Sequence, residues 1–223
     1  MDTIIYIIIW KSFEMRNLTF KQYRNIDLFL FAVMLTVSEA VCTIATNKWF
    51  AGGAIAVHST LVFVCIIMMR WNWFAVIHAC LGGLVFCITS IFTGFTDEHI
   101  VEQLLVYVLG NCFALLALLW FKVFKKEDVR KDLLKLILFV LSAYVMTEVG
   151  RCIVSLCFGR GIDVILAFFS SDIISVLFAL VIMIFLRGVD GMIEDQKAYL
   201  FRIQREAKAR QEQSFSGGYG SEE

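Results

Sequence analysis

Long apolar stretches alternate with short polar connections along most of the chain. A helix needs roughly 20 mainly apolar residues to cross the hydrocarbon core of a bilayer. Six stretches have this character: Leu28–Thr46, Gly53–Met69, Trp73–Phe95, Val101–Val123, Leu133–Phe158 and Val164–Leu186. The pattern predicts an all-α, polytopic membrane protein with six transmembrane helices in a domain at residues 28–187.

The chain changes character on both sides of this domain. In the N-terminal segment, residues 1–27, the apolar run Ile4–Trp10 is too short to span a membrane. Two interpretations stay open: the run lies at the membrane interface, or the protein starts at Met15. Beyond the sixth stretch, apolar residues at helical spacing predict a cytoplasmic amphipathic helix over residues 188–213, which lies on the membrane surface or binds a partner. The Ser- and Gly-rich residues 214–223 are expected to be a disordered tail.

Lys and Arg residues gather before the first stretch, in every second connection and in the C-terminal tail. They are Lys11, Arg16, Lys21, Arg24, Arg70, Lys122, Lys125, Lys126, Arg130, Lys131, Lys135, Arg187, Lys197, Arg202, Arg205, Lys208 and Arg210. The alternate connections carry only Lys48 and Arg160. Because basic connections stay on the cytoplasmic side, both termini are predicted to be cytoplasmic.

Composition supports a multi-pass protein of a cell membrane, surrounded by lipid. The chain is 60% hydrophobic and its mean hydropathy is +0.78. Soluble domains have about 45–50% apolar residues. These values exclude a disordered chain, and the balance of 20 basic and 20 acidic residues gives no sign of a nucleic-acid partner.

The motifs of common enzymes are absent from the sequence. It contains no G-x-x-x-x-G-K-[ST] phosphate loop, no G-x-S-x-G elbow and no H-E-x-x-H helix. All seven cysteines lie inside apolar stretches, their number is odd and no C-x-x-C occurs, so packing roles are expected rather than disulfides or zinc. We therefore expect neither an enzyme nor a bound cofactor or metal.

Polar residues inside the apolar stretches are the candidate functional residues, because an ionisable group there costs at least ~2.5–3.5 kcal/mol. The predicted orientation places six of them in the outer half or near the middle of the membrane: Glu39, His58, Asn111, Glu148, Arg151 and Asp172. They predict a polar pocket that opens outward and binds a small-molecule substrate. An alternative stays open, in which Arg151 only neutralises Glu148 and Asp172 within the bundle. His78, near the cytoplasmic end of its stretch, is interpreted as a packing residue.

Two local patterns resemble a known family. Tyr107-Val-Leu-Gly-Asn111 resembles a Tyr/Gly/Asn pattern, and Asn47-Lys48-Trp49-Phe50 occupies the position of a substrate-covering loop. With the six stretches and the absence of an energy source, the chain resembles the substrate-binding S component of energy-coupling factor (ECF) type ABC transporters. It departs from that family in lacking its alanine-xxx-alanine pattern in the first span, which contacts the scaffold.

The resemblance implies capture of a micronutrient at the bacterial cytoplasmic membrane. The partners would be a transmembrane scaffold subunit and two cytoplasmic ATPase subunits. Arg151 would meet an anionic group of the ligand, and Glu148 and Asp172 a cationic or hydroxylated part. Asn111 would orient the ligand, and Lys48 and Trp49 would close the mouth of the pocket.

Two other classes of function stay open. The first is a membrane adaptor or sensory subunit that recruits a partner through its cytoplasmic tail helix. The second is an intramembrane enzyme that uses Glu39 with His58 or His78. The three groups lie at different predicted depths, which disfavours a shared proton-transfer site.

Overall fold

The computed structural model describes residues 19–50, 56–94 and 99–216. Within these ranges all regular secondary structure is helical, which confirms the predicted all-α class. The α-helices and the two 3-10 helices, η2 and η3, are α2 (Phe20–Trp49), α3 (Thr60–Trp71), η2 (Asn72–Phe74), α4 (Ala75–Phe92), α5 (Ile100–Cys112), η3 (Phe113–Leu119), α6 (Trp120–Val123), α7 (Lys126–Lys131), α8 (Leu133–Cys157), α9 (Ile162–Ser171), α10 (Ile173–Arg187) and α11 (Gln196–Ser216).

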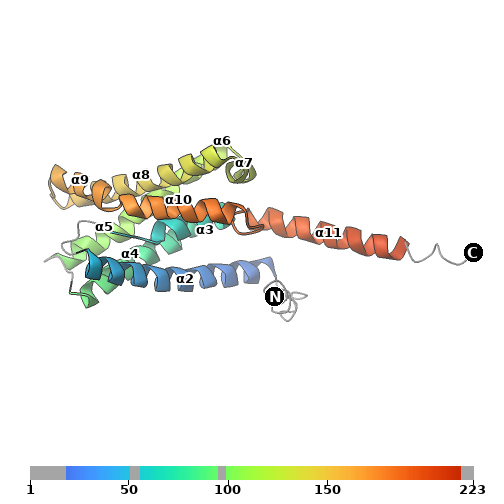
Figure 1. The fold of residues 1–223 in the computed structure, drawn as a ribbon, viewed down its shortest axis with the longest axis horizontal. Helices are drawn as coiled ribbons and strands as arrows, with labels where there is room; N and C mark the ends of the chain where they lie inside the picture. The colour runs from blue at the N-terminus through green and yellow to red at the C-terminus, as the bar shows by residue number, and fades with distance from the viewer. Residues whose placement is uncertain (1–18, 51–55, 95–98, 217–223) are drawn as a thin grey trace, which may run out of the picture.

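The long helices form a bundle along one axis, and α11 projects beyond one end of it (Figure 1). α5 packs between α4 and α8, while α2 packs against α4 and α3. α10 packs against α3 and α8. This arrangement encloses α3, which touches helices from both halves of the chain.

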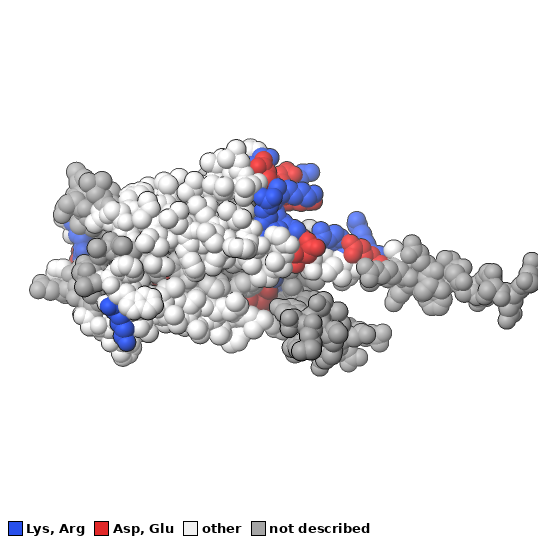
Figure 2. Space-filling view, viewed as in Figure 1, with Lys and Arg blue, Asp and Glu red and all other residues white. Residues whose placement is uncertain are grey.

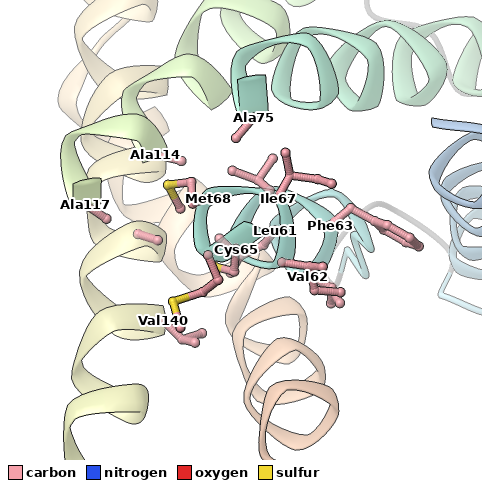
Figure 3. Close-up of a cluster of buried hydrophobic side chains, with 14 of the residues drawn as sticks. Leu61, Val62, Phe63, Cys65, Ile67, Met68, Ala75, Ala114, Ala117 and Val140 are labelled. Carbon is pink, nitrogen blue, oxygen red and sulfur yellow. The ribbon is translucent and has the colours of Figure 1, made fainter. Parts of the chain in front are cut away.

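The central helix α3 is buried along its whole length. All twelve of its residues, Thr60–Trp71, are buried. Figure 3 shows its side chains pointing outward around the axis toward Ala75 of α4, Ala114 and Ala117 of η3 and Val140 of α8. At 1.5 Å per residue α3 is about 18 Å long, shorter than the roughly 30 Å hydrocarbon core. In the described part of the second predicted span, Gly53–Met69, residues 56–59 are irregular and the helix begins at Thr60.

The chain reverses between α3 and α4 at Asn72. This residue has a φ of +54°, and among the described residues it is the one non-glycine with a positive φ. Asn tolerates this region better than most residues, because its short polar side chain forms local hydrogen bonds. The turn folds α4 back along α3.

Glycines allow the closest helix crossings. A Cβ on Gly83 of α4 would lie 2.7 Å from the Tyr107 carbonyl group of α5. A Cβ on Gly110 of α5 would lie 2.5 Å from Arg151 Cγ of α8. These crossings bring α5 close to α8, so Asn111 can reach the Arg151 side chain.

In the described part of the chain, four helical stretches are long and apolar enough to cross a membrane: Phe20–Trp49, Thr60–Phe92, Ile100–Val123 and Leu133–Cys157. The second of these contains the α3–α4 turn, and the sixth predicted span is divided into α9 and α10 at Asp172. The visible face of the bundle carries charges near its ends and a wide uncharged band between them (Figure 2). Exposed Phe29, Phe92 and Phe185 belong to this apolar surface, which is typical of a helical bundle surrounded by lipid.

The cytoplasmic amphipathic helix was predicted to begin at residue 188, and that boundary is wrong. α11 begins at Gln196, because residues 188–195 form turns that include Gly191 at a φ of +78°. The Asp195 carboxylate then accepts from the backbone N–H groups of Lys197 and Ala198 and stabilises the first turn. The helix continues to Ser216; residues 217–223, the run Ile4–Trp10 and Met15 lie outside the described residues.

The close α5–α8 crossing predicts that Gly150→Ala destabilises the bundle. A Cβ there would lie 2.5 Å from Phe113 Cγ and 2.6 Å from the Gly110 carbonyl oxygen. We expect a loss of about 1–3 kcal/mol, seen as a lower unfolding temperature in detergent. Gly188→Ala is the control, because its Cβ would meet its nearest neighbour at 3.6 Å. Equal unfolding temperatures for the two variants would contradict the crossing.

Candidate ligand-binding site

Six of the eight candidate residues come together in one buried polar cluster. Its members are Glu39 of α2, His58 before α3, Asn111 of α5, Glu148 and Arg151 of α8, and Asp172 between α9 and α10. Each is 3% exposed or less. Residues that are up to 133 positions apart in sequence therefore lie together in one cluster.

Glu39 caps the N-terminus of α3. Its Oε2 atom accepts hydrogen bonds from the backbone N–H groups of Ser59 and Thr60, at 2.8 and 2.9 Å, and from both hydroxyl groups, at 2.9 Å. The first turn of a helix has unpaired N–H groups and a partial positive charge. The Glu39 carboxylate accepts from these N–H groups and also neutralises part of the positive charge. The sequence did not indicate this role for Ser59 and Thr60.

His58 joins Glu39 to the far side of the bundle. Its Nδ1 atom lies 2.7 Å from Glu39 Oε1, and its Nε2 atom lies 3.6 Å from Asp172 Oδ2. Its backbone N–H donates to Ser175 Oγ of α10 at 2.8 Å, and the N–H of Ala56 donates to the Ser171 carbonyl oxygen. The irregular segment before α3 is therefore tied to the α9–α10 junction. Among the described residues, Nε2 has no hydrogen-bond partner.

Arg151 is surrounded by acceptors. Its Nε and Nη2 atoms donate to Asn111 Oδ1 at 3.1 and 2.9 Å, and Nη1 donates to Glu148 Oε1 at 3.1 Å. Nη1 also pairs with Asp172. The guanidinium carbon lies 4.6 Å from the centre of the Tyr107 ring.

The Tyr107-Val-Leu-Gly-Asn111 pattern thus has a structural meaning. One helical turn supplies a ring face for the Arg151 cation, space at Gly110 for the arginine stem, and a carbonyl acceptor at Asn111. Cations are attracted to the faces of aromatic rings. The pattern forms a cradle for Arg151.

The cluster contains more acidic than basic groups. Three carboxylates, on Glu39, Glu148 and Asp172, face the guanidinium of Arg151 and the imidazole of His58. Within the described part of the chain, Glu148 Oε2 is buried without a hydrogen-bond partner. A buried acceptor in that state costs about 1–3 kcal/mol, and more when it is charged.

Two cavities adjoin the cluster. The inner cavity has a volume of about 20 Å³, which is room for one water molecule. Its lining includes Tyr144, Thr147 and Glu148. The outer one offers about 90 Å³ by the same measure and is lined by polar groups such as Thr46, Asn47 and Gln103.

Three aromatic rings in contact line the outer cavity, and one of them also lines the inner cavity. The His58 ring packs on Phe86 with a centroid distance of 4.5 Å, and Phe86 packs on Tyr107 at 4.3 Å. All three residues line the outer cavity, and His58 lines both. These three rings are referred to below as the aromatic layer.

Lys48 and Trp49 lie in the last turn of α2, away from the cluster. Both side chains are exposed, Trp49 at 79%. It is their neighbour Asn47 that lines the outer cavity, where its amide donates to Thr93 Oγ1 at 2.7 Å. The structure therefore brings six of the eight candidate residues together and leaves these two exposed, outside the lining of both cavities.

A second polar cluster, missed by the sequence reasoning, lies at the other end of α3. Arg70 donates to both carboxylate oxygens of Asp27, at 2.9 and 2.6 Å, and the Trp71 indole donates to the same carboxylate at 2.5 Å. Arg70 also contacts the carbonyl oxygens of Gly191 and Met192. The sequence does contain a sign of this pair, because Asp27 directly precedes the first apolar stretch and Arg70 directly follows the second.

The turns before α11 are also held by charged groups of α7. Lys126 lies 3.2 Å from Asp195, and Arg130 lies 2.8 Å from Asp190. Burial lowers the pKa of the Lys126 ammonium, and the nearby Asp195 carboxylate partly offsets this effect. These contacts fix the base of α11 to the bundle.

No protein-family model, curated protein sequence or solved structure matches the chain.

The cap on α3 predicts a large loss of stability for Glu39→Gln. The amide removes the charge that pairs with His58 and replaces one acceptor atom with a donor. Breaking a buried pair leaves the partner uncompensated and costs about 3–5 kcal/mol. The measurement is thermal or denaturant unfolding of the purified protein.

Glu102→Gln is the matched control, because Glu102 pairs with Arg160 in a partly exposed position. We expect it to lose less than about 1 kcal/mol. Similar losses in the two variants would show that Glu39 is not the cap on which α3 depends.

Proposed function

We propose that this protein is the substrate-capture subunit of an uptake transporter in a cell membrane. It has six membrane segments with both termini in the cytoplasm. A small micronutrient enters from outside, and partner ATPases supply the energy through a scaffold subunit. The observation that carries the proposal is the outer polar cavity, which adjoins a buried cluster of ionisable groups.

The position of the cluster supports capture from the outer side. Glu39 lies ten residues before the end of α2, about 15 Å along its axis. The opposite end of the bundle carries α7 and the base of α11, where basic residues gather. Basic connections favour the cytoplasmic side, so the outer cavity faces away from the cytoplasm.

In this proposal the segment before α3 is the part that moves when a ligand enters. Residues 56–59 are irregular and hold His58 in the aromatic layer. Hydrogen bonds from Ala56 and His58 to Ser171 and Ser175 fasten the segment. Release of these bonds opens the layer, and their formation over a ligand closes it.

Capture predicts that Thr46→Val weakens ligand binding several-fold. Thr46 lines the outer cavity, and valine keeps the shape while it removes the hydroxyl. One lost hydrogen bond corresponds to about 0.5–1.5 kcal/mol, or roughly 3–10-fold in affinity. The ligand is first identified by mass spectrometry of small molecules released on denaturation, and its affinity is then measured by titration.

Thr36→Val is the control on the same helix, because the Thr36 side chain is exposed and its hydroxyl donates to the carbonyl oxygen of Ala32. It should bind normally. If no small molecule is released and none of a nutrient panel stabilises the protein, capture is ruled out.

A second function rests on α11. This helix projects from the bundle, and its Phe201 is 55% exposed beside an apolar groove lined by Phe20, Tyr23 and Leu200. An adaptor would use this helix to bind a partner protein.

Truncation after Gln204 separates the two functions. It retains Gly191, Met192 and Gln196, which contact Arg70 or its carbonyl partners, whereas truncation after Arg187 would remove them. A capture subunit should keep full ligand affinity and an unchanged unfolding temperature. An adaptor would lose its partner in co-purification and show no ligand affinity before or after truncation.

A further inference from the structure

We infer that the captured ligand is a small organic cation, an amine whose charged group binds at Glu148 and Asp172. This inference rests on the proposed function and names its substrate class. It is carried by the charge balance of the cluster, the acceptors that already surround Arg151 and the unpaired oxygen of Glu148.

The charge balance favours a cation. With His58 protonated, the described residues of the cluster contain two positive groups and three carboxylates, and with His58 neutral the excess of negative charge is larger. An uncompensated charge is costly in a buried site, so a positive ligand stabilises the cluster and a negative one destabilises it.

Arg151 has few donors left for an anion. Four of its five side-chain N–H groups donate to neighbours, Nε and Nη2 to Asn111 and Nη1 to Glu148 and Asp172, and its face lies on the Tyr107 ring. An anionic ligand would have to displace Glu148, Asp172 or Asn111 and would then lie beside two carboxylates. In this arrangement Arg151 is the counter-ion that holds Glu148 and Asp172 in place, which replaces the expectation that it meets an anionic group.

Glu148 Oε2 is the acceptor that lacks a partner. The residue is 1% exposed, and among the described groups this oxygen has no donor. The Glu148 residue lines the inner cavity, where the free space fits one water-sized group. An ammonium group has that size and supplies the missing donor.

The outer cavity suits the remainder of such a ligand. It offers about 90 Å³ and has Phe86 and Tyr107 in its wall. Ring faces attract cations, and the amide of Gln103 can bind a polar substituent. In the described chain, no three His, Cys, Asp or Glu residues converge as metal ligands, so the geometry favours an amine over a divalent metal.

The test compares probes of similar size and different charge on the full-length protein in a non-ionic detergent. Ethylammonium, ethanol and acetate are titrated while the unfolding temperature is recorded, and released endogenous ligand is identified by mass spectrometry. We expect ethylammonium to raise the unfolding temperature, with no rise from acetate, and the released molecule to be an amine.

Glu148→Gln should weaken the affinity for ethylammonium at least about tenfold, while Glu102→Gln retains the unmodified affinity. If Glu148→Gln does not fold, the charge of the ligand released from the unmodified protein decides the question. A released or stabilising anion overturns the inference and leaves capture standing. Absence of both released ligand and stabilisation by any probe overturns the inference and the proposed function together.

Discussion

The buried N-terminus of α3 is the constraint on which the rest of the structure depends. Since α3 is enclosed on every side, the N–H groups of its first turn cannot reach water. Glu39 supplies them with a carboxylate oxygen, and its second oxygen contacts His58. A buried charge and a buried helix end are each costly alone, but together they compensate one another. The same contact fixes His58 within reach of Asp172, and through Asp172 it positions Arg151.

The helix α2 supplies a carboxylate to each end of α3. Asp27 binds Arg70 in the last turn of α3, and Glu39 caps its first turn. The two acidic residues are twelve positions apart, about 18 Å on a helix, which equals the length of the twelve-residue α3. This match sets the register of the two helices. It also links the buried polar cluster at one end to the base of α11 at the other, because Arg70 contacts the turn at Gly191 and Met192.

Most of the helices and the members of the buried polar cluster could be predicted from the sequence. Apolar stretches predicted the helices, and the cost of burying charge selected Glu39, His58, Asn111, Glu148, Arg151 and Asp172, which do lie together. Hydropathy could not show that the second helix begins at Thr60, because His58 and Ser59 lie in an apolar context whether or not they are helical. It also could not place Lys48 and Trp49, whose orientation depends on where α2 ends.

By itself the sequence determined helix formation, the apolar belt and the set of costly polar residues, since these follow from local composition and from transfer free energies that act residue by residue. Only the tertiary structure decided which polar residues pair. Glu39 lies on a different helix from His58, and Arg151 has acceptors from three elements. Pairing depends on distances of a few ångströms between segments far apart in the chain, and no local pattern encodes them. In the structure Arg151 pairs with Glu148 and Asp172, a pairing that the sequence left open beside the expected contact with a ligand.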